Sequence, residues 1–112
     1  MTNGAASARN IATPAEIQAL AAKVLAQIDQ LFTAQQIHPN PVQQQMLASH
    51  VKAMALRSLT GEPLPEIEAE LFEEISPRSV QLAQQIVDLF GNLPQEESWL
   101  LSVHFDVARE NQ

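Results

Sequence analysis

The sequence predicts an all-α protein, a compact five-helix bundle in a single domain. Strong helix formers dominate its 112 residues, with 16 Ala, 13 Leu, 13 Gln and 10 Glu against 3 Gly. No segment shows the sustained alternation of apolar and polar residues that marks a strand. Apolar residues instead recur at helical spacing in five segments, which are separated by caps, glycines and prolines.

The first helix is predicted from Thr13 to about Gln35. Thr13 and Glu16 are spaced as a capping box, and Pro14 occupies the first helical position, where its missing N–H costs nothing. Residues 1–12 lack apolar periodicity, so we expect a flexible leader followed by one helical domain over residues 13–112.

The second helix is expected after Asn40 and Pro41, to run to about Leu59, and to end at Gly61. Its apolar stripe is predicted to comprise Val42, Met46, Leu47, His50, Val51, Met54 and Ala55. A short third helix is predicted after Pro65, with one apolar face and a strongly anionic face, because six glutamates and no cation lie between positions 62 and 74.

The fourth helix is predicted from Ser76-Pro77 to Gly91, and its wide apolar coverage favours a central position. The fifth follows Pro94 and continues through the apolar positions up to Ala108. These amphipathic patterns together predict the following core residues: Val24, Ile28, Val51, Met54, Val87 and Leu101.

Charge and composition exclude several classes of function. The chain has 13 Asp and Glu against 6 Lys and Arg, a net charge of −7, so we expect no direct nucleic-acid partner. No apolar run approaches the roughly 18 residues of a membrane span, and no signal peptide is present. With no cysteine and no standard catalytic signature, we expect a cytoplasmic protein that is not an enzyme and that holds no cofactor or metal.

Three histidines are the candidate functional residues. His38 lies between two helices beside prolines, where a loop histidine needs no special role. His50 and His104 each fall within an apolar helix stripe, where an imidazole is either a hydrogen-bonded core residue or part of a cleft. Arg57 lies two turns after His50 and could steady an anion, while Glu97 lies two turns before His104 and could orient its ring.

Two stretches carry a family resemblance. Residues 49–57, SHVKAMALR, place a histidine after a short polar residue and an arginine seven positions later. Residues 97–105, ESWLLSVHF, place a glutamate before an apolar helix and a histidine. In this order and separation, with similar connecting segments, they resemble the PTS regulation domain (PRD) of bacterial antiterminators and transcription activators. The resemblance extends from about Thr13 to Asn111.

The resemblance implies a five-helix, usually dimeric regulatory domain. Its two histidines, here His50 and His104, would accept phosphoryl groups from a phosphocarrier protein or a sugar-permease subunit of the phosphotransferase system, with Arg57 and Glu97 in support. Family regulators generally carry two such domains behind a nucleic-acid-binding module, whereas this chain has one copy. Ser49 stands where the family usually has an aspartate, and Ala53 replaces its usual aromatic residue.

The main hypothesis is therefore a stand-alone domain, switched by histidine phosphorylation, that regulates transcription for carbohydrate use through contacts with other proteins. We expect His104 to be the better acceptor, because Glu97 could orient its ring and His50 lacks the preceding aspartate. One alternative is a helical adaptor that has lost the switch, which Ser49 favours. A second is a small metal-binding protein that uses His50, His104 and Glu97.

Overall fold

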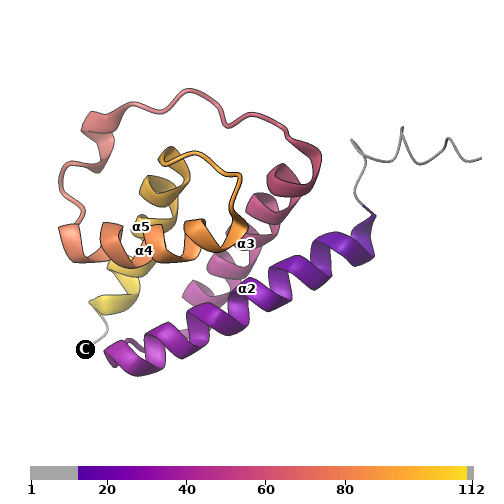
Figure 1. The fold of residues 1–112 in the computed structure, drawn as a ribbon. Coiled ribbons are helices and arrows are strands. Elements are labelled where there is room, and N and C mark those ends of the chain that lie inside the picture. Colours follow the sequence, from indigo (N-terminus) through magenta and orange to yellow (C-terminus); the bar gives the residue numbers. More distant parts are fainter. Residues whose placement is uncertain (1–12, 111–112) are drawn as a thin grey trace, which may run out of the picture.

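The structure, a computed structural model, describes residues 13–110. The leader predicted over residues 1–12 lies outside these residues, as do the last two positions. The described part contains four α-helices and one short 3-10 helix and has no strand. Two helical hairpins pack together, α2 with α3 and α4 with α5, and α3 also packs against α5 (Figure 1). The all-α class is confirmed.

The first hairpin begins with α2 (Pro14–Gln35). The Thr13 hydroxyl accepts a hydrogen bond from the backbone N–H of Glu16, and the Glu16 carboxylate accepts one from Thr13, which completes the predicted capping box. The helix ends at Gln36, whose backbone is left-handed, and the chain then turns toward α3. The predicted start and end of this helix are therefore confirmed.

Helix α3 (Pro41–Thr60) starts at the predicted Asn40 cap and ends at Gly61, whose φ of 78° is readily adopted only without a Cβ. Leu47, Val51, Met54 and Ala55 are buried, as expected. The prediction that Val42 and Met46 share this buried face is wrong, because they are 64% and 56% exposed. At 3.6 residues per turn, these two positions lie to one side of the line from Leu47 to Met54.

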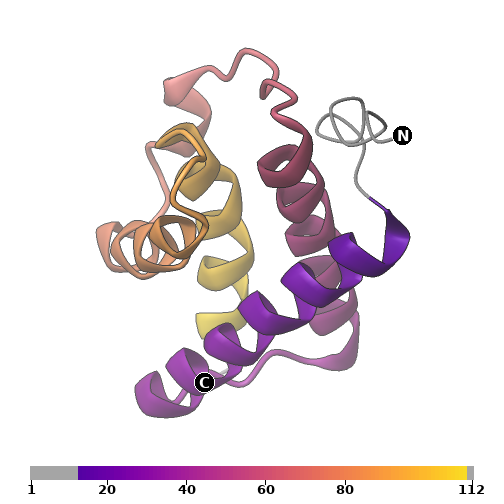
Figure 2. The same cartoon turned by 45° about the vertical axis from the view of Figure 1, so that its right-hand side comes forward.

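The predicted third helix does not form, so the five-helix expectation is wrong. Residues 61–68 have no regular helix, and only η1 (Ala69–Phe72), a 3-10 helix, follows. Pro63 and Pro65 precede the predicted helix and keep the chain before it irregular. The helix itself has no side-chain cap, because Glu68 provides none. Repulsion among six glutamates without an intervening cation adds to the cost. The segment instead arcs over the end of α5 (Figure 2).

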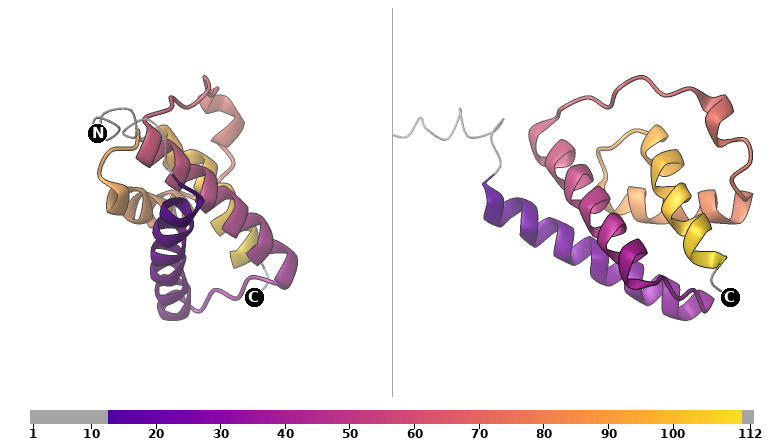
Figure 3. Two further views of the ribbon diagram at one scale, coloured as in Figure 1. Left: turned by 90° about the vertical axis from the view of Figure 1, so that its right-hand side faces the viewer. Right: turned by 180° about the vertical axis from the view of Figure 1, so that it is seen from behind.

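The second hairpin consists of α4 (Pro77–Phe90) and α5 (Glu96–Arg109). The Ser76 hydroxyl caps α4 by accepting from the backbone N–H groups of Arg78 and Ser79, and Gly91 ends the helix with a φ of 83°. One face of α4 is buried against α5 and α2, while Leu89 is 53% exposed. The helix therefore lies at the side of the bundle rather than at its centre (Figure 3).

The core lies between the two hairpins. All six predicted core residues are at most 3% exposed. The Phe32 ring on α2 meets the Phe105 ring on α5 edge to face, with centroids 4.9 Å apart. Buried aromatic pairs of this kind stabilise beyond the area they bury, so this contact helps to hold α5 against the first hairpin. No helix among the described residues is long and apolar enough to span a membrane.

Candidate functional site

The two candidate histidines meet across the interface of α3 and α5. The ring centroids of His50 and His104 are 4.9 Å apart, and their planes are tilted by 35°. Both side chains are partly buried. Residues 54 positions apart in the chain are thus brought into ring contact by the packing of the two helices.

The same interface contains a buried ion pair. The Arg57 guanidinium donates from Nε to Glu97 Oε2 at 2.6 Å and from Nη2 to Glu97 Oε1 at 2.7 Å. The side chain of Arg57 is 15% exposed, and that of Glu97 is fully buried. A two-bond fork between guanidinium and carboxylate is the geometry that best compensates for burying both charges.

The ion pair and the histidine pair are two levels of one antiparallel register. Arg57 lies seven residues after His50 on α3, and Glu97 lies seven residues before His104 on α5. Two helical turns cover about 10 Å, so the ion pair and the imidazoles are about that far apart along the interface. The seven-residue spacing within each helix therefore sets the distance between the ion pair and the imidazole contact.

Burial keeps both imidazoles neutral. The pKa of His50 is lowered from its ordinary value of 6.5 to about 4 by desolvation, by the neighbouring His104 and by the positive charge of Arg57. Desolvation also lowers the pKa of His104. At neutral pH each ring therefore has one nitrogen with a free lone pair, which can act as a nucleophile or a ligand.

The two rings differ in access. Nε2 of His50 is buried and has no hydrogen-bond partner, and it is the one such side-chain nitrogen or oxygen within residues 13–110. His104 has no buried, unpaired nitrogen of this kind. The nitrogens of His104 are therefore not enclosed in the way that Nε2 of His50 is.

The predicted supporting residues contact each other instead of the imidazoles. Both oxygens of Glu97 accept hydrogen bonds from Arg57, and no hydrogen bond joins Glu97 to His104 in the described part of the chain. Glu97 does not approach the two imidazoles as a third metal ligand either, since no group of three metal-binding side chains occurs in that part. His38 is exposed in the connection between α2 and α3, and Ser49 is exposed on α3.

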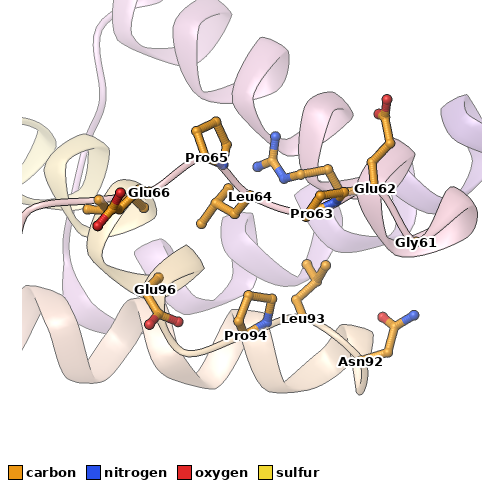
Figure 4. A pocket seen from close by; sticks show the side chains of 12 residues that line it. Gly61, Glu62, Pro63, Leu64, Pro65, Glu66, Asn92, Leu93, Pro94 and Glu96 are labelled. Atoms are coloured by element: carbon orange, nitrogen blue, oxygen red, sulfur yellow. The ribbon is translucent and has the colours of Figure 1, made fainter.

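A cavity that the sequence did not indicate lies beside the ion pair. It has a volume of about 620 Å³ and is formed by the loop after α3, the loop before α5 and the side chain of Arg57. Pro63 and Leu64 face Leu93 and Pro94 across it (Figure 4). The two prolines signalled irregular loops, but only the fold shows that these loops lie opposite each other.

The last turn of α3 is tied to the loop between α4 and α5 next to this cavity. The Ser58 hydroxyl donates to Asn92 Oδ1 at 2.7 Å, and Asn92 Nδ2 donates to the Ser58 carbonyl at 2.8 Å. A second polar network joins α4 to α5, where the Ser79 hydroxyl donates to Asp106 Oδ1 and Arg109 Nη1 donates to the hydroxyls of Ser76 and Ser79. Both networks act on the geometry of α5, which carries His104 and Glu97.

Comparisons with known proteins agree with this architecture. No protein-family model matches the chain, and no curated protein matches it. Among solved structures, the chain is similar to a PRD-containing transcription regulator from Lactobacillus casei ATCC 334, with 32% sequence identity and a TM-score of 0.77. The match covers 92% of this chain and 100% of that one. At this identity and coverage, the chain belongs to the PRD family.

The buried ion pair makes a prediction about stability. Replacing Glu97 with Gln should lower the free energy of unfolding by about 3 to 5 kcal/mol, because the largely buried guanidinium of Arg57 loses its counter-charge. The double variant Arg57→Met and Glu97→Met should lose clearly less free energy of unfolding than the single variants Arg57→Met and Glu97→Met lose in sum. Urea unfolding followed by circular dichroism measures both effects.

The neighbouring Glu96 provides the matched control, because it is exposed in the same helical turn. Glu96→Gln should change stability by no more than about 0.5 kcal/mol. Equal effects of Glu96→Gln and Glu97→Gln would contradict a structural role for the ion pair.

The lowered pKa of His50 predicts a pH dependence of stability. Between pH 6.5 and about 4 the unfolded chain binds a proton at His50 that the folded chain does not. The contribution of neutral His50 to the free energy of unfolding is therefore fully present above pH 6.5 and is lost as the pH decreases through this range. The total loss attributable to His50 should be on the order of 3 kcal/mol. Unfolding free energies measured at several pH values should therefore fall less steeply in His50→Gln than in the unchanged protein.

His38→Gln is the control, because it removes an exposed histidine. Its pH profile should follow that of the unchanged protein. If His50→Gln left the slope between pH 6.5 and 4 unchanged, His50 would not be the buried neutral group described above.

Proposed function

We propose that this PRD-family chain is a regulatory domain switched by phosphorylation of His104 and, secondarily, of His50. The observation that carries the proposal is the contact between two neutral imidazoles at the two positions that match the family signatures. The solved neighbour is described as a transcription regulator, which supports a role in transcriptional regulation. From the family resemblance, we propose that the domain acts in the cytoplasm and regulates the transcription of genes for carbohydrate use.

The chemistry requires one nucleophilic nitrogen and a phosphorylated protein donor. A lone pair of the neutral ring attacks phosphorus, and the new N–P bond forms as the N–P bond of a donor phosphohistidine breaks. The donor nitrogen keeps the bonding electron pair and takes up a proton, while the attacked ring loses the proton from its other nitrogen to water. No catalytic turnover of a small substrate is involved, so we propose a switch and not an enzyme.

The new charge provides a physical means of switching. A phosphoryl group adds close to two negative charges at neutral pH, at an interface where both rings are neutral. Such a charge must be solvated or paired, which changes the relative stability of alternative helix packings or assemblies. The output is then read by other proteins, in agreement with the net charge of −7, which disfavours direct binding to nucleic acid.

The ranking of the two histidines rests on access. Nε2 of His50 is buried and has no hydrogen-bond partner. Neither nitrogen of His104 is both buried and unpaired. The hypothesis that Glu97 orients the His104 ring has no support from a hydrogen bond, since the carboxylate is bound by Arg57. His104 remains the preferred acceptor for the reason of access.

Phosphorylation should depend on His104 most strongly. The protein is incubated with a purified phosphocarrier protein or permease subunit that has been phosphorylated by its own cascade, and acid-labile phosphate is mapped by mass spectrometry. Most label should disappear in His104→Ala and a smaller part in His50→Ala, because a donor reaches the less buried ring more easily.

His38→Ala is the matched control and should be labelled like the unchanged protein. Unchanged labelling of His104→Ala would reject the ranking. Labelling that persists in the double variant His50→Ala and His104→Ala would reject the site. A complete lack of labelling would favour the adaptor alternative.

We also propose that the domain forms a homodimer, because exposed apolar side chains flank the histidine pair. Val42 and Met46 on α3 and Val107 on α5 are 64%, 56% and 38% exposed, and the Gln43 amide donates to the Val107 carbonyl at 3.4 Å, which brings these helix ends together. Exposed apolar groups of this kind favour association.

Light scattering should therefore show a dimer, and Met46→Lys should shift it toward monomer. Leu71→Lys, a change of an exposed leucine on η1, should not do so. A monomer at high micromolar concentration would contradict the proposed assembly.

A further inference from the structure

The distance between the two imidazoles limits how many phosphoryl groups the pair can hold. The ring centroids of His50 and His104 are 4.9 Å apart. Each phosphoryl group would carry about −1.5 to −2 charges at neutral pH. Both rings are partly buried, and salt screens charges at a partly buried interface much less than charges in open solvent.

Within residues 13–110, the two cations nearest to His50 on α3 are not placed to neutralise a second group. Arg57 lies on the same face of α3 as His50, but its guanidinium already donates two hydrogen bonds to the buried carboxylate of Glu97. Lys52 is two positions from His50, so on an α-helix it points away from the histidine interface. The buried Nε2 of His50 further limits where a second phosphoryl group could be attached without separating the helices.

We infer that His50 and His104 form a single phosphoryl site, which accepts one group on either ring and then excludes the other. This inference rests on the proposed function, in which these two imidazoles are the acceptors. Phosphoryl groups that point away from each other would be about 11 Å apart, where two charges near −2 disfavour the second phosphorylation by about tenfold at the dielectric constant of water and by more at the lower dielectric constant of a protein surface. The domain would thus have two charge states, not three.

Single occupancy has a consequence for regulation. If different donors prefer His50 and His104, each donor blocks the reaction of the other at the same domain. The pair would then report that some donor has acted, and a second donor would add no further charge.

The test uses potassium phosphoramidate, a small reagent whose N–P bond breaks with loss of ammonia as a new N–P bond forms on an imidazole. It needs no protein donor. All measurements are made in a His38→Gln background, because the exposed His38 could also react. Intact-protein mass spectrometry at neutral to alkaline pH counts the phosphoryl groups on each molecule during a long incubation.

The folded His38→Gln protein should gain one phosphoryl group, and less than about a tenth of its molecules should carry two. The variants that also carry His50→Gln or His104→Gln should each gain one group at most, and the variant that retains His104 should react faster. In concentrated urea, where the rings separate, the His38→Gln protein should gain two groups.

Two results would overturn the inference: a major doubly modified form of the folded protein, or a folded protein that gains no group while the urea-unfolded protein gains two. Failure of the proposed function has a different signature. In that case a phosphorylated protein donor leaves the chain unlabelled, although phosphoramidate still adds a single group to the folded pair.

Discussion

The buried ion pair between Arg57 and Glu97 is the interaction on which the site depends. It connects α3 to α5 by two charge-assisted hydrogen bonds, and the carboxylate has no contact with solvent. An ion pair that is buried this deeply adds little net stability compared with apolar packing, but breaking it is costly. Its main effect is therefore on geometry, since only one register of the two helices brings the guanidinium onto the carboxylate.

That register determines what the histidines can do. His50 is seven residues from Arg57 on α3, and His104 is seven residues from Glu97 on α5. The contact between Arg57 and Glu97 therefore also fixes the contact between the two imidazoles. The polar networks around Ser58 and Ser79 hold the two ends of the second hairpin in the same arrangement. A new charge at the imidazoles acts on an interface that has little freedom to adapt locally, which is the physical basis for a switch.

Most of the fold could be predicted from the sequence because its signals are local. Thr13, Asn40 and Ser76 cap the helices that follow them, and Gly61 and Gly91 end α3 and α4. The buried positions of α2 and α4 follow the helical period. The predicted third helix does not form although its apolar residues between Ile67 and Ile75 have helical spacing, because it lacks a side-chain cap and its glutamates repel one another. In a short segment those costs exceed what one apolar face can recover.

The sequence by itself determined the boundaries of the four α-helices, most of the core, and the spacing of His50 with Arg57 and of Glu97 with His104. Only the tertiary structure decided how these pairs combine: Glu97 binds Arg57 and not His104, and the two imidazoles meet each other. It also left Val42 and Met46 exposed and placed a cavity between two loops that are distant in the chain. The physical reason is that helical periodicity specifies which residues share a face, whereas the partner of that face depends on how separate helices pack.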